Sequence, residues 1–509
     1  KKAALYDYNL ELQEDAFYNC VKLSYQIDLP FENTLEKMRL YLDRFNHPMH
    51  TKKIQTLMAK TLQSTSQFFE AYSVLKDVDS PTLDQKKTLQ QLSFYLGVKE
   101  FNKQDFKSAI SYFLYSNEYP IEDAYYYLSN YWVADCYFHL GDFQRSIDIY
   151  TNMPMAPASV SSYQRSKKYN LAYSYFQQRD YINAVKWFLS YEEMAIDSMK
   201  LNDTYLRIAD GYFMSNNFTL SAKYYSKAVS TNIFDVDYAL YQQSISLGLI
   251  GDNLERVRIL EVLVSDFPVS SYYTNALYDL AKYHKNTSNY DLAVMYYDSL
   301  INFNDDDNLM ADSYLSKGII YFNSEMVELA IDNFLFVVNN YQKTKYFKEA
   351  LSGLQSAYAT IGSIKQYLDV VKSLPEISIT ESEQDSLMYS TAFMKFSEMD
   401  YMIARTAFDS YLNRFPIGIF VDDATYYNAI SALNVEDTTS AIYYYKKVVD
   451  SNSSPYHEDA LKFLARRTYT LADFAESNIY YEKLLACASS NSIKREALIR
   501  LMLLNEHSD

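Results

Sequence analysis

The chain has few of the residues that interrupt helices. Its 509 residues include only 9 glycines and 10 prolines, and this scarcity favours long helices joined by short turns. The 3 cysteines, Cys20, Cys136 and Cys487, lie far apart in the sequence, which argues against a disulfide framework. No uninterrupted apolar run approaches the roughly 18 residues of a membrane-spanning helix, so we expect no transmembrane segment.

The sequence motifs of catalysis and cofactor binding are also missing. The chain contains no HExxH, GxSxG, GxGxxG, P-loop or CxxC motif, so we expect no enzymatic activity and no cofactor. Of its 6 histidines, only His47 and His50 are close in sequence, in a turn around Pro48. Because the sequence offers no further ligand beside them, it predicts no metal site.

Positive charge is in deficit. The chain has 47 Lys and Arg residues against 64 Asp and Glu residues, which gives a net charge of −17. This balance argues against a nucleic-acid backbone or an anionic membrane surface as the main partner. Hydrophobic residues make up 49% of the chain, enough for a folded protein.

What the sequence does contain is a repeat. A small residue, here called the anchor, recurs about every 37 residues and is usually followed four positions later by an aromatic residue. Self-similarity at such a period predicts stacked supersecondary units without a single globular core. Arg256 and Tyr367 replace the small residue in two of the units. The thirteen anchor positions are Thr34, Ala71, Ala109, Ser146, Ala184, Ser221, Arg256, Ala293, Ala330, Tyr367, Ala404, Ala441 and Ser477.

A second small residue stands twelve positions before most anchors, as in Gly97, Ala134 and Ala172. Small side chains on two facing helices let the helix axes approach closely, and flanking aromatic rings fill the remaining space. Gly141-Asp142 and Gly251-Asp252 fall between the two small positions, where a helix stop is expected. Each unit is therefore predicted to be an antiparallel pair of helices, each of about 13–16 residues.

This pattern resembles the tetratricopeptide repeat (TPR). The clearest matches are Leu96-Gly97 with Phe106, Ala109 and Phe113; Ala134, Tyr137, Gly141-Asp142-Phe143 and Tyr150; and Leu171-Ala172, Tyr175, Tyr181, Ala184 and Phe188. The resemblance implies an all-α, TPR-like superhelical solenoid of about 13 helix-turn-helix repeats. We expect one continuous solenoid over residues 1–509, a fragment of a longer chain, with irregular loops near 151–162 and 374–383.

A narrower resemblance concerns the junctions between units. The segment Phe267-Pro268-x-Ser270-x-Tyr272 is similar to junctions in envelope-type TPR proteins of Gram-negative bacteria, including outer-membrane assembly lipoproteins; Phe415-Pro416 and Ser454-Pro455-Tyr456 echo it. Proline ends one helix there, and serine can cap the next. The resemblance implies a periplasmic protein associated with the outer membrane, without a direct transmembrane segment, and it leaves open attachment through a lipid anchor or a partner.

Aromatic residues recur on a second face of the first helix of each unit. The first-helix tyrosines, fifteen positions before the anchor, are Tyr131, Tyr169, Tyr241, Tyr278, Tyr389 and Tyr426, and the first-helix phenylalanines, eight positions before it, include Phe138, Phe176 and Phe213. Positions seven apart share one helix face, and the TPR resemblance implies that this face lines a concave groove. One hypothesis is therefore a peptide-binding groove, and the alternative is packing of these rings against the next unit.

Charges beside these aromatic residues change sign along the chain, from Asp135 and Asp210 to Lys282 and Arg466. The predicted groove is thus acidic in the N-terminal half and mixed beyond it. The predicted function is a non-catalytic scaffold that binds other proteins or peptides, as part of an outer-membrane-associated assembly or secretion complex. Two alternatives stay open: a cytoplasmic regulatory adapter, and the interaction module of a larger enzyme.

Overall fold

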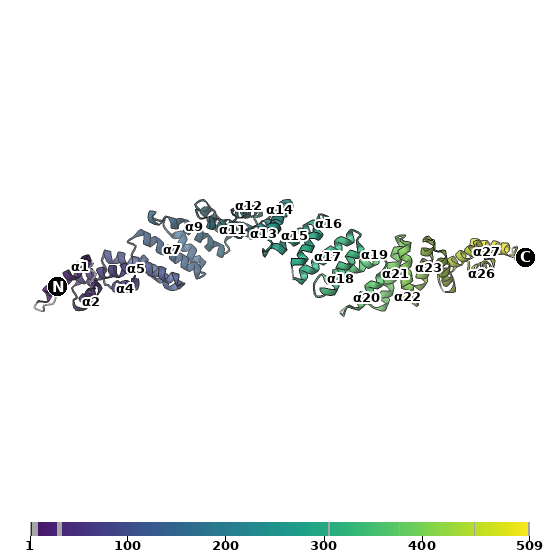
Figure 1. Ribbon diagram of the computed structural model, residues 1–509, viewed down its shortest axis with the longest axis horizontal. Coiled ribbons are helices and arrows are strands. Elements are labelled where there is room, and N and C mark those ends of the chain that lie inside the picture. The colour runs from purple at the N-terminus through teal and green to yellow at the C-terminus, as the bar shows by residue number, and fades with distance from the viewer. Residues whose placement is uncertain are drawn as a thin grey trace. The chain divides into compact units, whose positions relative to one another are not determined.

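The computed structural model describes residues 2, 9–27, 33–303, 306–375, 377–451 and 454–506. These residues form 27 α-helices, and the short 3-10 helix η2 lies between two of them (Figure 1). Thirteen consecutive helix pairs, α1/α2 to α25/α26, are followed by α27, so the predicted all-α, TPR-like solenoid with about 13 hairpins is confirmed. The chain divides into two compact units, Lys1–Tyr273 and Thr274–Asp509, and each is described by itself.

The first unit contains seven hairpins. Their helices are α1 (Leu10–Ile27), α2 (Thr34–Arg44), α3 (Pro48–Ser64), α4 (Phe68–Leu75), α5 (Leu83–Asn102), α6 (Phe106–Glu118), α7 (Asp123–His139), α8 (Phe143–Asn152), α9 (Ser162–Gln177), α10 (Tyr181–Glu192), α11 (Ser198–Met214), α12 (Phe218–Thr231), α13 (Val236–Ile250) and α14 (Asn253–Asp266), with η2 (Ala158–Val160) before α9.

The second unit contains six hairpins and the last helix. Its helices are α15 (Tyr273–Asn286), α16 (Tyr290–Phe303), α17 (Asp307–Asn323), α18 (Val327–Asn340), α19 (Phe347–Thr360), α20 (Ile364–Lys372), α21 (Glu381–Ser397), α22 (Tyr401–Arg414), α23 (Val421–Asn434), α24 (Thr438–Asp450), α25 (His457–Thr470), α26 (Phe474–Cys487) and α27 (Asn491–Glu506).

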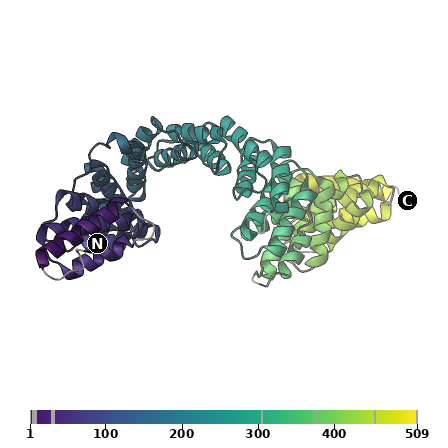
Figure 2. The same cartoon turned by 60° about the vertical axis from the view of Figure 1, so that its left-hand side comes forward.

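The two helices of a hairpin differ more in length than the repeat suggests. First helices have 14 to 20 residues and second helices 8 to 14. Within each unit a helix packs on the next helix in sequence (Figure 2). Several first helices also contact the first helix of the following hairpin, as α7 contacts α9 and α21 contacts α23. Such consecutive first helices therefore lie side by side within each unit.

The predicted contact between the small residues of the two helices of a hairpin, here called the seam, is confirmed. Anchors such as Ala109, Ala184 and Ala441 have no exposed surface. Opposite them, a Cβ atom added to Gly97 would lie 2.6 Å from the ring of Phe113. The small residue on the first helix is therefore required by the aromatic ring four positions after the anchor, because the two surfaces are already in contact.

The turns inside the hairpins follow one design. A residue with positive φ stands five positions before twelve of the anchors, and it is glycine only at Gly141, Gly251 and Gly362. The next residue is often Asp or Asn, whose side chain caps the second helix; Asp180, for example, accepts a hydrogen bond from the backbone N–H of Asn183. Left-handed backbone and a capping carboxylate together end one helix and start the next.

The two predicted irregular loops lie between hairpins. In the first, α8 continues to Asn152 and α9 begins at Ser162, with η2 between them. In the second, α20 ends at Lys372 and α21 begins at Glu381, where Thr380 and Glu383 form a capping box. The loop was predicted to extend to residue 383, but it ends at residue 380, because the capping box starts α21 at Glu381. Residue 376 lies outside the described residues.

Candidate functional site: an aromatic and acidic groove in the first unit

A groove with a volume of about 410 Å³ separates the first helices α7 and α9. Its lining residues are Asp135, Phe138, His139, Tyr169, Asn170, Tyr173 and Gln177. Phe138 and Tyr169 belong to the groove residues that the sequence predicts, and Asp135 was expected to make the groove acidic. Asn170 and Tyr173 complete it, although nothing in the repeat distinguishes them.

Asp135 is the charged group of this groove, and it is largely withdrawn from water. Burial raises the pKa of Asp135 above its ordinary value of 3.8, although the nearby His139 and hydrogen bonds from Tyr150 and Asn170 counteract the shift. The amide nitrogen of Asn170 lies 3.0 Å from Asp135 Oδ1, and His139 Nε2 lies 3.9 Å from Asp135 Oδ2. A desolvated carboxylate in a cleft is a common feature of binding sites.

Two of the groove tyrosines, Tyr169 and Tyr173, are hydrogen-bonded to a polar network on α11. Tyr169 donates a hydrogen bond of 2.6 Å to Asp203 Oδ2, and Tyr173 donates to the same oxygen. Arg207 bridges Asp203 to Asp210, with 2.5 Å between its Nη1 and Asp210 Oδ2. This network fixes the tyrosine rings, since each hydroxyl has a charged acceptor.

Asp210 itself does not contribute charge to an open groove. It is only 8% exposed, and it accepts hydrogen bonds from Tyr225 and Tyr238 in addition to its pair with Arg207. The prediction that Asp210 makes the groove acidic is therefore wrong, because its position beside the first-helix aromatic residues carries no information on burial by neighbouring helices. Asp135 is the acidic residue of the two that lines the groove.

The first-helix tyrosines mostly pack against the following hairpin. Tyr131 is only 6% exposed, and its ring lies 5.0 Å from that of Tyr163, so it belongs to the core and not to a groove surface. Tyr241 stacks on Tyr272 with a centroid distance of 5.1 Å. The three in the second unit also have partners from the next hairpin: Tyr278 donates to Asp312, Tyr389 stacks on Phe420 and Tyr426 stacks on Tyr456.

The first-helix phenylalanines pack next to the turn of their own hairpin, against the first residue of the second helix. Phe138 contacts Phe143, Phe176 contacts Tyr181 and Phe213 contacts Phe218, with ring centroids 5.4–5.5 Å apart and edge-to-face geometry. Such pairs contribute about 0.5–1.5 kcal/mol beyond burial. These half-buried rings therefore hold the two helices of the hairpin together at the turn, and Phe138 additionally lines the groove.

The junction segments Phe267-Pro268-x-Ser270-x-Tyr272 and Ser454-Pro455-Tyr456 are also explained by packing between hairpins. Ser270 Oγ accepts a hydrogen bond from the backbone N–H of Tyr272, and Ser454 Oγ does so from Tyr456. The serine thus turns the chain so that the following tyrosine stacks on a first-helix tyrosine of the preceding hairpin. Packing between hairpins is sufficient to explain the motif, whatever the compartment.

A larger hollow of about 830 Å³ lies at α1, α3 and the start of α5. Its lining residues are Tyr18, Lys22, Tyr25, Gln26, Pro48, Met49, Lys52, Lys53, Thr56, Leu57, Thr82 and Asp84. It contains none of the predicted groove residues, and its lysines give it a charge opposite to that of the groove at Asp135. We regard it as a separate feature of the first unit.

No protein-family model matches the chain, and no curated protein does. Similar solved structures include Naa15/Naa10 bound to HypK-THB, at a TM-score of 0.36 and 14% identity, over 97% of this chain and 78% of that one. The C-terminal part of a TPR repeat-containing protein from Cytophaga hutchinsonii has a TM-score of 0.27 and 13% identity, over 65% and 99% of the two chains. The TPR domain of P58(IPK) has a TM-score of 0.21 and 12% identity, over 82% and 99%.

Proposed function

We propose that the protein is a non-catalytic scaffold that binds other proteins, and that the groove between α7 and α9 takes a basic side chain of a partner segment. The observation that carries this proposal is the Asp135 carboxylate, desolvated at the base of a groove with aromatic walls. The nearest cationic group is His139, which is exposed and lies 3.9 Å from the carboxylate, and a buried charge with such weak compensation costs stability. Retaining the carboxylate there is understandable if a ligand supplies a closer positive charge.

The groove has the size and composition that this role requires. Pockets for ligand groups typically start near 300 Å³, so about 410 Å³ accommodates a lysine or arginine side chain. The rings of Phe138, Tyr169 and Tyr173 provide faces and edges for the aliphatic stem and for cation–π contact. Asn170 adds an amide that can bond to the partner's backbone.

We expect Asp135→Asn to weaken partner binding while leaving the fold intact. The amide is isosteric and keeps an acceptor for Asn170, but it removes the charge, so the loss is that of a charge-assisted hydrogen bond, about 1.5–3 kcal/mol. The partner is first isolated by co-purification from the source organism, and its affinity is then measured by calorimetry. Asp148→Asn, on α8 and outside the groove lining, is the control; equal binding by wild type and Asp135→Asn contradicts the proposal.

The same substitution has a pH signature. Because burial raises the pKa of Asp135 in the folded state, the folded protein holds this proton more tightly than the unfolded chain does. Its stability therefore decreases as pH rises from about 4 through the folded-state pKa. Asp135→Asn should remove this slope and raise the melting temperature at pH 7, whereas a lower melting temperature at pH 7 would show that the carboxylate is satisfied inside the fold.

For the setting, we propose the periplasm and association with the outer membrane, on the sequence resemblance of the junctions. None of the described helices combines the length and apolar character needed to cross a bilayer. Fractionation of the source cells, with immunodetection of the native protein, tests this: recovery with outer-membrane complexes supports the proposal, and recovery in the cytoplasm supports the adapter alternative.

A further inference from the structure

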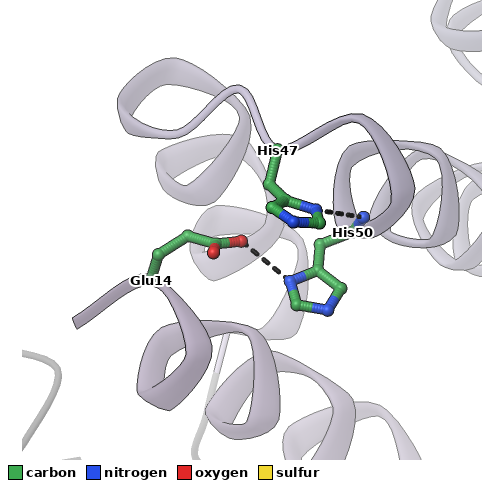
Figure 3. Close-up of side chains that lie close together, drawn as sticks. All are labelled: Glu14, His47 and His50. Carbon is green, nitrogen blue, oxygen red and sulfur yellow. Dashed lines mark hydrogen bonds and ion pairs between the residues drawn. The ribbon is translucent and has the colours of Figure 1, made fainter. Parts of the chain in front are cut away.

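Two neighbouring histidines and a carboxylate that is distant from them in sequence lie together at the first two hairpins. Glu14 is on α1, His47 is the N-cap of α3, and His50 is in the first turn of α3. Because α1 contacts α3 directly, Glu14 reaches the turn that carries both histidines (Figure 3). The sequence predicted no metal site here because it showed no third ligand, and the packing of α1 on α3 supplies one.

The donor atoms of these residues are close enough to share one ion. His50 Nδ1 lies 2.8 Å from Glu14 Oε1, and one ligand atom from each of the three side chains lies within 4.8 Å of the others. Donors around a tetrahedral ion bound at about 2.0–2.2 Å are roughly 3.3–3.6 Å apart. Glu14 Oε1 and His50 Nδ1 would therefore move slightly apart and exchange their hydrogen bond for the metal, and the wider separations in the group would shrink. His47 can make this movement because it is exposed, and its Nδ1 makes only a 3.4 Å contact with the His50 N–H.

Neighbouring side chains orient two of the three donors. The hydroxyl of Tyr41, which is fully buried, donates a hydrogen bond to Glu14 Oε1. The ring of Tyr18 stacks on His50 with 4.0 Å between centroids and a 5° interplanar angle. Outer contacts of this kind hold metal ligands in position and are a regular part of metal sites.

We propose that Glu14, His47 and His50 bind a divalent transition-metal ion of the Zn²⁺ type, which links the first hairpin to the second. Two imidazoles and one carboxylate suit Zn²⁺, whereas Ca²⁺ and Mg²⁺ prefer sites made of oxygen ligands. Three protein ligands leave one coordination position for water or for a ligand from a partner. The hollow at α1 and α3 adjoins the site through Tyr18 and Pro48 and provides an entry path.

The test is titration of the chelator-treated full chain with ZnCl₂ by isothermal calorimetry at pH 7.5. We expect one Zn²⁺ per chain at this site, no comparable binding of MgCl₂, and a rise of a few degrees in the melting temperature on saturation. Glu14→Gln and His50→Ala should each weaken binding at least about tenfold. Lowering the pH to 5.5 should also weaken it, because protons compete with a metal ion for imidazole nitrogens.

His457→Gln, in the second unit, is the matched control and should bind Zn²⁺ as the wild type does. His47→Ala changes an exposed side chain, so it keeps the proposal testable if Glu14→Gln fails to fold, as circular dichroism would show. Unchanged Zn²⁺ affinity in both His47→Ala and His50→Ala would overturn the proposal, and so would the absence of Zn²⁺ binding by the wild type.

Discussion

Tyr131→Ala is expected to destabilise the first unit by about 3–5 kcal/mol, the range for removing a large buried aromatic side chain. The Tyr131 ring is 6% exposed and lies 5.6 Å from Trp132, 5.7 Å from Tyr150 and 5.0 Å from Tyr163. Its hydroxyl also accepts a hydrogen bond of 2.9 Å from Asn170. Truncation therefore leaves a cavity between α7 and α9 and deprives Asn170 of an acceptor.

Thermal and urea denaturation followed by circular dichroism measure this effect. Tyr131→Phe should lose only about 1 kcal/mol, since it keeps the ring and removes one hydrogen bond. Tyr443→Ala is the surface control, because that side chain is 53% exposed and its loss should change little. The opposite result, a stable Tyr131→Ala protein that no longer binds its partner, would favour the sequence-based hypothesis that Tyr131 lines the groove.

The contrast between Tyr131 and the anchors shows how far a repeat can be interpreted from sequence. The seam could be predicted because both of its members, such as Gly97 and Ala109, belong to one hairpin and recur with its period. The tyrosines could not be assigned, because their contacts lie in the next hairpin. Tyr241 meets Tyr272, and Tyr389 meets Phe420, in segments between hairpins whose path the period does not determine.

The charged residues of the candidate sites show a second limit. Asp135 and Asp210 occupy equivalent-looking positions among 64 acidic residues, yet one lines a groove and the other is paired with Arg207. Burial separates them, and burial depends on neighbouring helices. Glu14 is similar, since its role beside His50 requires α1 to pack on α3, a contact between different repeats.

Gly97→Ala is expected to destabilise the first unit by about 1–3 kcal/mol, the usual cost of overpacking. The added Cβ would lie 2.6 Å from the ring of Phe113, and that ring is fully buried, so it cannot swing into solvent. In an unconstrained helix the same substitution would stabilise, because alanine has the higher helix propensity by about 1 kcal/mol. A destabilising effect therefore indicates close packing at the seam, and a stabilising effect indicates that the packing there is loose. Gly318→Ala should behave alike in the second unit, since its Cβ would lie 2.5 Å from Phe334.

Gly248→Ala is the matched control in the first unit. Its Cβ would meet the side chain of Arg256, at 3.2 Å from Cδ, and a flexible side chain can move aside at little cost. We therefore expect Gly248→Ala to be neutral or stabilising, by up to about 1 kcal/mol, while Gly97→Ala destabilises. Phe113→Leu should partly rescue Gly97→Ala in a double-mutant cycle, because the smaller side chain frees the space that the new methyl group needs. Equal effects of Gly97→Ala and Gly248→Ala would mean that the small residue facing the anchor does not set the approach of the helices.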